Sequence, residues 1–286
     1  MVIDYLCLYH AGVSIRIRKA VIPAAGLGTR LYPLTRAQPK EMLPIVDKPV
    51  IHRVVDEAIR AGLDQILIIV GKSKNSIIDY FDTSVFDKTT KESAAWFEKM
   101  PSIYFVRQRE QKGLGDAITY ARDFVGNEDF VVLLGDTIYM TSSDKTITEQ
   151  TIDVYENYKA PVVAVESVPK ERISSFGIIK GTKIGDRVWR MEDVVEKPKI
   201  EKAPSNLSIA GTYVLKPDIF RYLDKITPSV GGEYQLTDAL KLMCDEQKLL
   251  AYEIMGKRYD IGTTELWMKA FMDFAKKDGR FDHVIG

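Results

Sequence analysis

The sequence is poor in the residue types that build disulfide frameworks and metal clusters. It holds only two cysteines, Cys7 and Cys244, which lie far apart in the chain. Its three histidines, His10, His52 and His283, show no metal-ligand spacing. This pattern argues against a disulfide-stapled domain and against a zinc cluster. We therefore expect a cytoplasmic protein, in a compartment that keeps thiols reduced.

Net charge and long apolar runs are also missing. Forty basic residues balance forty acidic residues. A nucleic-acid-binding surface needs a basic patch or stripe, so we expect no nucleic-acid partner. No apolar run approaches the length that spans a bilayer, so we expect no membrane partner. Residues 1–18 lack the basic start of a targeting peptide, and we interpret them as an N-terminal extension.

From residue 19 onward, the chain carries the hydrophobic pattern of an α/β protein. Hydrophobic residues make up 45% of the sequence, which is enough for a sizeable core. Apolar runs at 20–22, 65–70 and 130–134 predict buried strands, and helical patterns lie between them. Alternating strands and helices indicate a doubly wound, mostly parallel, Rossmann-like sheet.

The pattern changes in the second half of the chain. Residues 177–195 alternate around Gly185-Asp186, which predicts an inserted antiparallel hairpin. A further strand is expected at 207–215, and helices are expected at 114–124, 217–225, 235–247 and 263–277. No low-complexity linker separates these parts, so we expect a single domain over residues 19–286.

The loop after the first strand has the composition of an anion site. Residues 24–30, AAGLGTR, place small residues before a guanidinium. Glycines let a backbone approach a ligand closely, and a turn after a buried strand can present N–H groups to phosphate oxygens. Arg30 adds a forked positive charge, and Lys40 adds a second cation ten residues later. This combination suits a polyphosphate.

Other interpretations of this loop remain open on the residues alone. It fits an ordinary strand-to-helix turn whose cations face solvent. A nicotinamide-dependent oxidoreductase would need a third glycine where Leu31 stands, and the Gly-Lys-Ser/Thr ending of the P-loop is absent. The two cations at this spacing favour the phosphate site.

Two adjacent motifs resemble those of a known enzyme family. Residues 26–35, GLGTRLYPLT, resemble the signature of the sugar-1-phosphate nucleotidylyltransferases. Residues 38–49, QPKEMLPIVDKP, resemble the UTP–glucose-1-phosphate uridylyltransferase branch in particular. The resemblance implies the nucleotide-diphospho-sugar transferase fold, with a nucleotide-binding half at 19–140 and a sugar-binding half at 160–262. It also implies a homo-oligomer, either a dimer or a tetramer.

For the nucleotide, the resemblance implies a set of contacts on the first half of the chain. Without it, Gln108 and Gly113 would be a polar loop before a helix. With it, the Gln108 amide matches the imide edge of uracil or thymine. The implied nucleotide-binding residues are Ala24, Ala25, Gly26, Gly28, Thr29, Arg30, Lys40, Gln108 and Gly113.

Two acidic residues are candidate ligands of Mg²⁺. Asp136 ends an apolar run, and Asp260 precedes a glycine and a predicted helix. Carboxylate oxygens suit this hard cation. Each residue alone is an ordinary turn aspartate, and only the fold can bring them together, as the resemblance implies.

For the sugar 1-phosphate, the resemblance implies four residues. Lys197 would contact the phosphate, and Glu196 would accept hydrogen bonds from sugar hydroxyls. Gly177 and Gly211 would leave space for the ring. Glu233, in a segment that the family places near the sugar, is by itself equally a helix cap.

These expectations combine into a direct displacement reaction. The phosphate of α-D-glucose 1-phosphate attacks the α-phosphorus of UTP, and UDP-glucose and pyrophosphate form. The expected catalytic residues are Arg30, Lys40, Asp136, Lys197 and Asp260, with Mg²⁺ as cofactor. Residues 30–35 are closer to the broad family, which includes thymidylyltransferases. A dTTP–glucose-1-phosphate thymidylyltransferase, an N-acetylglucosamine-1-phosphate uridylyltransferase and a non-catalytic regulatory subunit therefore remain alternatives.

Overall fold

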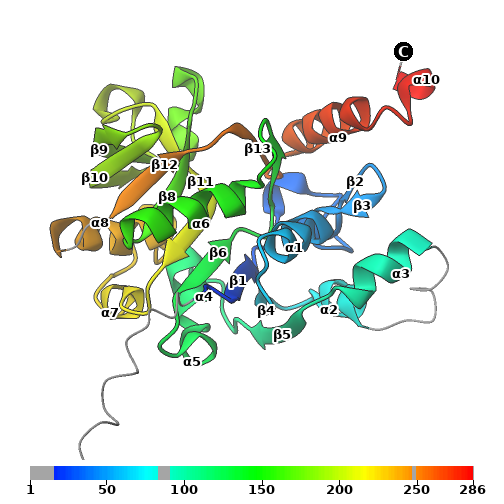
Figure 1. The fold of residues 1–286 in the computed structure, drawn as a ribbon, viewed down its shortest axis with the longest axis horizontal. Helices are drawn as coiled ribbons and strands as arrows, with labels where there is room; N and C mark the ends of the chain where they lie inside the picture. The colour runs from blue at the N-terminus through cyan, green and yellow to red at the C-terminus, as the bar shows by residue number, and fades with distance from the viewer. Residues whose placement is uncertain (1–15, 83–90, 247–248, 286) are drawn as a thin grey trace, which may run out of the picture.

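A nine-stranded sheet with helices on both faces organises the chain (Figure 1). The computed structural model describes residues 16–82, 91–246 and 249–285. The strand order is β5-β4-β1-β6-β11-β8-β12-β10-β9. Its first four strands run parallel to one another, namely β5 (Ser102–Arg107), β4 (Gln65–Val70), β1 (Lys19–Ala24) and β6 (Phe130–Leu133).

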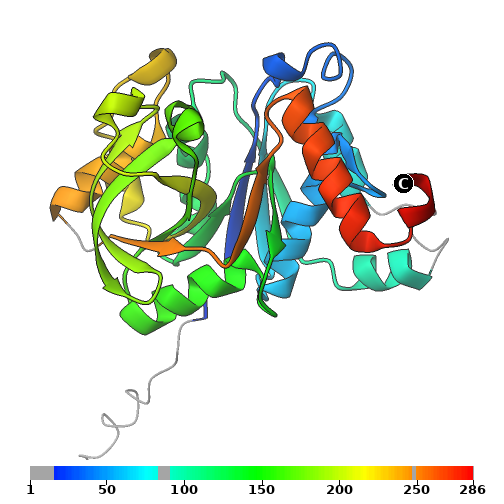
Figure 2. The same cartoon turned by 90° about the horizontal axis from the view of Figure 1, so that it is seen from above.

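The other half of the sheet is mainly antiparallel. It consists of β11 (Leu207–Leu215), β8 (Val162–Ser167), β12 (Leu250–Glu253), β10 (Val188–Glu196) and β9 (Gly177–Gly185). Only β8 and β12 pair in parallel there, and a bridge between Ser208 and Ile178 joins β9 back to β11. This half therefore curls on itself, as Figure 2 shows. The predicted doubly wound α/β fold with an inserted hairpin is confirmed. Parallel pairing is confined to two parts of the sheet, the run β5-β4-β1-β6 and the pair β8-β12.

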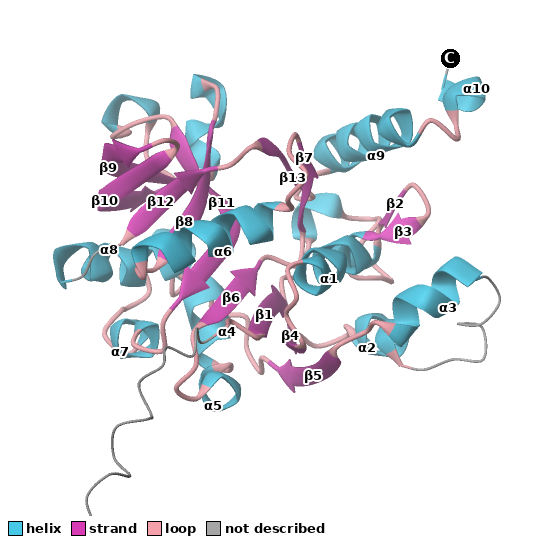
Figure 3. Ribbon diagram, viewed as in Figure 1, coloured by secondary structure: helices cyan, strands magenta, loops and turns pink. Residues whose placement is uncertain are grey.

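Helices cover both faces of the sheet (Figure 3), and a hydrophobic core lies on each face. Side chains alternate along β1, so Ala20 and Ile22 enter one core and Val21 enters the other. The first core includes residues of α1 (Val50–Arg60) and α6 (Ile147–Tyr158). The second includes residues of α4 (Leu114–Thr119), α5 (Arg122–Val125), α7 (Ile219–Leu223) and α8 (Leu236–Glu246). The single helix predicted over 114–124 is thus two short helices.

A separate two-stranded ribbon crosses between the halves of the molecule. It pairs β7 (Thr137–Thr141) with β13 (Gly256–Asp260) in antiparallel register, and Asp260 lies opposite Thr137. The Ile261 N–H donates to the Asp136 carbonyl at 2.9 Å. The ribbon, which the sequence patterns did not predict, thereby joins two distant parts of the chain.

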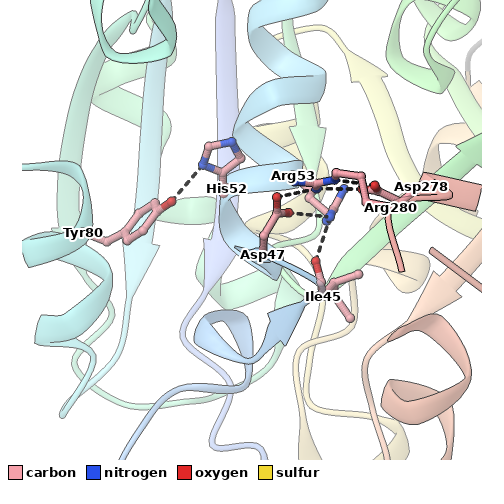
Figure 4. A network of polar contacts seen from close by, with 7 residues as sticks. All are labelled: Ile45, Asp47, His52, Arg53, Tyr80, Asp278 and Arg280. Carbon is pink, nitrogen blue, oxygen red and sulfur yellow. Dashed lines mark hydrogen bonds and ion pairs between the residues drawn. The ribbon is translucent and has the colours of Figure 1, made fainter. Parts of the chain in front are cut away.

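The last helices brace the segment that follows the first loop. α9 (Thr264–Asp278) packs beside β2 (Pro44–Ile45), while β3 (Lys48–Pro49) packs beside α1. α10 (Asp282–Ile285) ends the described chain. The indole N–H of Trp267 donates to the Pro44 carbonyl at 2.9 Å. After α9, Arg280 donates to Asp47 at 2.6 Å, and Arg53 on α1 donates to the Ile45 carbonyl at 2.7 Å (Figure 4). This network holds the β2–β3 turn between α1 and the C-terminal region.

The remaining helices close the edge of the sheet beside β5. They are α2 (Asn75–Phe81) and α3 (Lys91–Glu98). His52 is buried beneath them. Its Nδ1 lies 2.8 Å from the Tyr80 hydroxyl (Figure 4). Its ring stacks on Trp96 at 3.9 Å between centroids.

Part of the predicted N-terminal extension packs on this domain. Ile17 is buried, and the Arg18 carbonyl accepts from the N–H groups of Asp64 and Gln65. Cys7 and His10 lie outside the described residues. Within the part of the chain that is described, no helix has the length and apolar character needed to cross a bilayer.

Candidate active site

Two adjoining cavities open where the parallel strands end. The larger, about 680 Å³, is lined by residues that follow β1, β5 and β6, and we call it the large cavity. The smaller, about 220 Å³, lies against the curled half of the sheet, and we call it the small cavity. They share six lining residues and form one cleft: Arg30, Leu114, Leu134, Asp136, Ser175 and Lys197. Ligands of open α/β sheets bind at this end of the strands.

The loop after β1 forms one wall of the large cavity. Gly28 has φ 67°, a left-handed conformation that glycine adopts at no steric cost, and its carbonyl accepts from the Thr35 hydroxyl at 2.8 Å. A short 3₁₀ turn, Thr29–Leu31, then directs Arg30 toward both cavities. Ala25, Gly26, Gly28 and Thr29 line the cavity as predicted. Ala24 does not, because its side chain is buried in the core.

Lys40 and Asp136 form an ion pair within the cleft. Burial alone would lower the Lys40 pKa, but the carboxylates of Asp136 and Glu41 outweigh it and raise that pKa. Burial would likewise raise the Asp136 pKa, but the Lys40 ammonium outweighs it and lowers that pKa. Both groups are therefore charged at neutral pH.

The β7–β13 ribbon brings Asp260 to the same site. Asp136 lines both cavities, and Asp260 lines the small one. Burial, followed by repulsion from Asp136, raises the Asp260 pKa. A cation beside both groups would relieve this repulsion. Two carboxylates that face a cleft large enough for phosphates and water match the way Mg²⁺ is bound in many phosphoryl-transfer enzymes.

Further metal ligands would come from the substrate or from water. Among the residues that the structure describes, no group of three or more His, Cys, Asp or Glu side chains could hold a metal ion. Mg²⁺ commonly keeps several waters and shares phosphate oxygens with its substrate, so the donor set fits this ion.

Arg30 lies beside Asp260 because residue 262 is glycine. A Cβ atom at Gly262 would stand 2.9 Å from the Arg30 Nη2 and 3.2 Å from both Asp260 carboxylate oxygens. Any larger residue would displace one of these groups. The guanidinium thus reaches the carboxylate site from the loop after β1.

The predicted sugar-side residues meet in the small cavity. Gly177, Glu196, Lys197 and Gly211 all line it. The Thr237 hydroxyl donates to Glu196 Oε2 at 3.0 Å, and the Lys197 ammonium lies 3.4 Å from Glu196 Oε1. The structure therefore places a carboxylate and an ammonium side by side at the cavity wall.

Two of these residues have positive φ angles. Lys197 has φ 44°, and its N–H donates to the Phe176 carbonyl at 3.0 Å. A lysine in this conformation carries backbone strain of a kind that gathers at functional sites. Gly211 has φ 94° inside β11, and a Cβ there would lie 3.3 Å from Leu134 and Thr137 side-chain atoms. Because residue 211 is a glycine, no side chain from this position fills the small cavity.

Gln108 and Gly113 lie at the far wall of the large cavity. Gln108 is buried, and its amide group reaches this cavity. Gly113 has φ 112°, and a Cβ there would stand 2.6 Å from the Tyr234 carbonyl oxygen. A glycine is required here because the 231–238 segment approaches the backbone closely. The sequence predicts a different reason, namely contact of Gly113 with the nucleotide. That approach brings Glu233 to the large cavity.

Arg258 is a site residue that the sequence patterns missed. It lies two residues before Asp260, so both side chains point to the same face of β13. Its buried guanidinium pairs with Glu166 at 2.7 Å and lies 4.0 Å from the ring centroid of Phe176. It lines the small cavity. Alternation along β13 would have identified it if that strand had been predicted.

Glu41 and Lys74 form a second unpredicted feature. They make a buried ion pair at 2.7 Å, and Glu41 lines the large cavity next to Lys40. Burial raises the Glu41 pKa, and Lys74 opposes that shift. The pair ties the Lys40 segment to the loop after β4.

Known proteins resemble this chain over nearly its whole length. The sequence model of the family described as "Nucleotidyl transferase" matches residues 19–277. A UTP–glucose-1-phosphate uridylyltransferase of Staphylococcus epidermidis is 45% identical over 273 residues, which cover 92% of this chain and 94% of that protein. All the cleft residues described above fall within the family match.

Solved structures share this fold. A UDP-glucose pyrophosphorylase complexed with UDP-glucose superposes with a TM-score of 0.87 at 41% identity, covering 91% of this chain and 99% of that one. The UTP-bound UGPase of Acinetobacter baumannii has a TM-score of 0.81 at 36% identity, covering 91% and 94% of the two chains.

Proposed function

Because the chain belongs to the nucleotidyl transferase family, we propose that it transfers a uridylyl group from UTP to α-D-glucose 1-phosphate, with release of pyrophosphate. The observation that carries this proposal is a single cleft whose lining includes three cationic side chains and two carboxylates from distant parts of the chain. They are Arg30, Lys40, Lys197, Asp136 and Asp260. The relatives named for this reaction, and the neighbours holding UTP and UDP-glucose, support the same substrates.

On the nucleotide side, the loop after β1 and its cations bind the triphosphate. Backbone N–H groups around Gly26 and Gly28 face the phosphates, and Arg30 and Lys40 neutralise their charge. Lys40 keeps its positive charge because its carboxylate neighbours raise its pKa. It exchanges its contact with Asp136 for a phosphate oxygen when the nucleotide binds.

Asp136 and Asp260 hold Mg²⁺ in this proposal. When bound, the ion withdraws charge from phosphoryl oxygens and so stabilises the charge that develops during transfer. The role of the two aspartates is to position it beside Arg30, at the junction of the two cavities. Their mutual repulsion in the metal-free protein favours the binding of a cation.

On the sugar side, Lys197 binds the phosphate of glucose 1-phosphate, and Glu196 accepts from sugar hydroxyls. Gly177 and Gly211 leave room for the ring. The attacking phosphate is already ionised, so no nucleophile from the protein is needed. Catalysis then consists of positioning two anions in line and neutralising their charge.

A matrix of pyrophosphate-release assays tests the proposal. UTP, dTTP, ATP, CTP and GTP are each combined with the 1-phosphates of glucose, galactose and N-acetylglucosamine, with and without Mg²⁺. UTP with glucose 1-phosphate should give the highest kcat/KM. A single methyl distinguishes thymine from uracil and is worth only about 1–3 kcal/mol, so dTTP is the expected second substrate. Absence of pyrophosphate release from every pair would refute the proposal and favour a regulatory subunit.

Assembly and location remain predictions. The expected dimer or tetramer has a candidate contact in α9, where Met268 and Met272 are 56% and 39% exposed. Light scattering of the purified protein measures the assembly directly. Cys244 is a free cysteine, and burial raises the pKa of its thiol to about 12.

A further inference from the structure

The orientation of the Gln108 amide is set by two acceptors behind it. Gln108 Nε2 donates to Asp116 Oδ2 at 2.7 Å and to the Gly113 carbonyl at 3.4 Å. An ionised carboxylate and a carbonyl only accept hydrogen bonds, so the NH₂ group must point toward them. The reversed amide would bring Oε1 against both acceptors.

The other end of the amide is left for a ligand. Gln108 is 3% exposed and lines the large cavity. Among the described residues, none donates to its Oε1, and this oxygen is not enclosed. The cavity wall therefore presents a fixed hydrogen-bond acceptor and no donor from this side chain.

A fixed acceptor distinguishes pyrimidine bases by their ring nitrogen. Uracil and thymine carry a hydrogen on N3, which can donate to Oε1. Cytosine N3 carries a lone pair instead, so it would face Oε1 acceptor to acceptor. Binding cytosine in the same place would require the amide to reverse.

We propose that Asp116 is a specificity-determining positioning residue, which locks the Gln108 amide so that the site accepts uracil and rejects cytosine. This inference rests on the proposed function, which puts the base of the nucleotide at Gln108. Asp116 acts through Gln108 and needs no contact with the substrate.

The backbone around Asp116 is held firmly enough for this role. Asp116 lies in the first turn of α4, where the Thr119 hydroxyl donates to its carbonyl at 2.6 Å. The Gly115 N–H donates to the Tyr234 carbonyl at 2.8 Å, which anchors the turn to the neighbouring segment. The backbone that carries the carboxylate is therefore held by contacts that do not depend on Gln108.

The near-isosteric substitution Asp116→Asn tests the lock. An asparagine amide can itself reverse and donate to Gln108 Oε1, so either orientation of Gln108 becomes satisfied. A buried acceptor facing another acceptor costs a factor of about 10 to 100 in binding, so wild type should prefer UTP over CTP by at least that factor. In the variant, this preference should fall about tenfold, through a lower KM for CTP. Asp123→Asn, an exposed residue on α5, is the matched control and should keep the wild-type ratio.

Selectivity separates this role from a structural one. A variant that only destabilised α4 would lose activity with both nucleotides alike and leave their ratio unchanged. An unchanged ratio in Asp116→Asn, or equal use of UTP and CTP by wild type, would overturn the proposal. Calorimetric titration of both proteins with UTP and with CTP measures the same preference without turnover. Absence of turnover with any sugar phosphate would thus refute the proposed reaction, while equal affinities would refute the role of Asp116.

Discussion

Asp136→Asn should separate catalysis from substrate binding. The substitution removes one of the two carboxylates proposed to hold Mg²⁺ and leaves a neutral side chain of the same size. Loss of one such electrostatic contact costs about 2.7–4 kcal/mol in the barrier, so kcat should fall by a factor of about 10²–10³. Glucose 1-phosphate should still bind, because its proposed contacts, Lys197 and Glu196, line the small cavity and are unchanged.

The cost in stability should be smaller than that of an ordinary buried ion pair. Breaking a fully buried pair costs about 3–5 kcal/mol. Here the side chains of Lys40 and Asp136 remain 14% and 21% exposed to the cavity, and asparagine can still accept from the ammonium. The change also relieves Asp260 of a repulsive neighbour. We therefore expect a loss of about 1–3 kcal/mol in the free energy of unfolding.

Three measurements on one preparation check this reasoning. Pyrophosphate release gives kcat at saturating Mg²⁺, calorimetry gives glucose 1-phosphate affinity, and urea titration gives stability. Asp144→Asn, an exposed aspartate beyond the same ribbon, is the control and should behave as wild type. Near-normal turnover of Asp136→Asn at saturating Mg²⁺ would refute its metal role.

Further substitutions test other parts of the structure. Gly113→Ala should lower the free energy of unfolding by about 2–4 kcal/mol in urea titration, because its φ is 112° and a Cβ would lie 2.6 Å from a carbonyl oxygen. Gly231→Ala, with φ 73°, ψ 9° and no atom within 4 Å, should cost only about 1 kcal/mol, and equal losses would contradict this account. Asp260→Asn should abolish turnover. It should also raise the urea midpoint of the metal-free protein at neutral pH, because burial and the Asp136 carboxylate raise the pKa of the Asp260 carboxyl from 3.8 and so make its ionised form destabilising. That gain should disappear below about pH 3, where the carboxyl is neutral in both states, and a gain that persisted there would rule out this cause. In initial-rate assays, Lys197→Met should raise the KM for glucose 1-phosphate about tenfold or more and leave the KM for UTP within about twofold. Equal changes in the two KM values would exclude the assignment of Lys197 to the sugar phosphate.

Local patterns in the sequence predicted the parts of the fold that depend on neighbouring residues. The runs at 65–70 and 207–215 coincide with β4 and β11, and the alternation at 177–195 matches the hairpin of β9 and β10. Apolar periodicity reports burial directly, so these elements can be identified without knowing their partners. The residues of the phosphate loop were found in the same way, because glycine spacing and cations are local features.

The motifs also predicted residues that lie together in the cleft. The predicted catalytic residues line the two cavities, as do most of the predicted binding residues. Ala24 is the exception, because its side chain faces the core. Its position at the end of a strand does not reveal which face the side chain occupies.

Only the tertiary structure decided which distant residues act together. The meeting of Asp136 with Asp260 depends on the pairing of β7 with β13, which no local pattern in the sequence predicted. The contact of Gln108 with Asp116 depends on how α4 packs against β5 and the 231–238 segment. A sequence records the preference of each short segment for a conformation. Pairing between segments far apart is set by the packing of the whole chain, and so the joining of charges into one site appears only in the folded molecule.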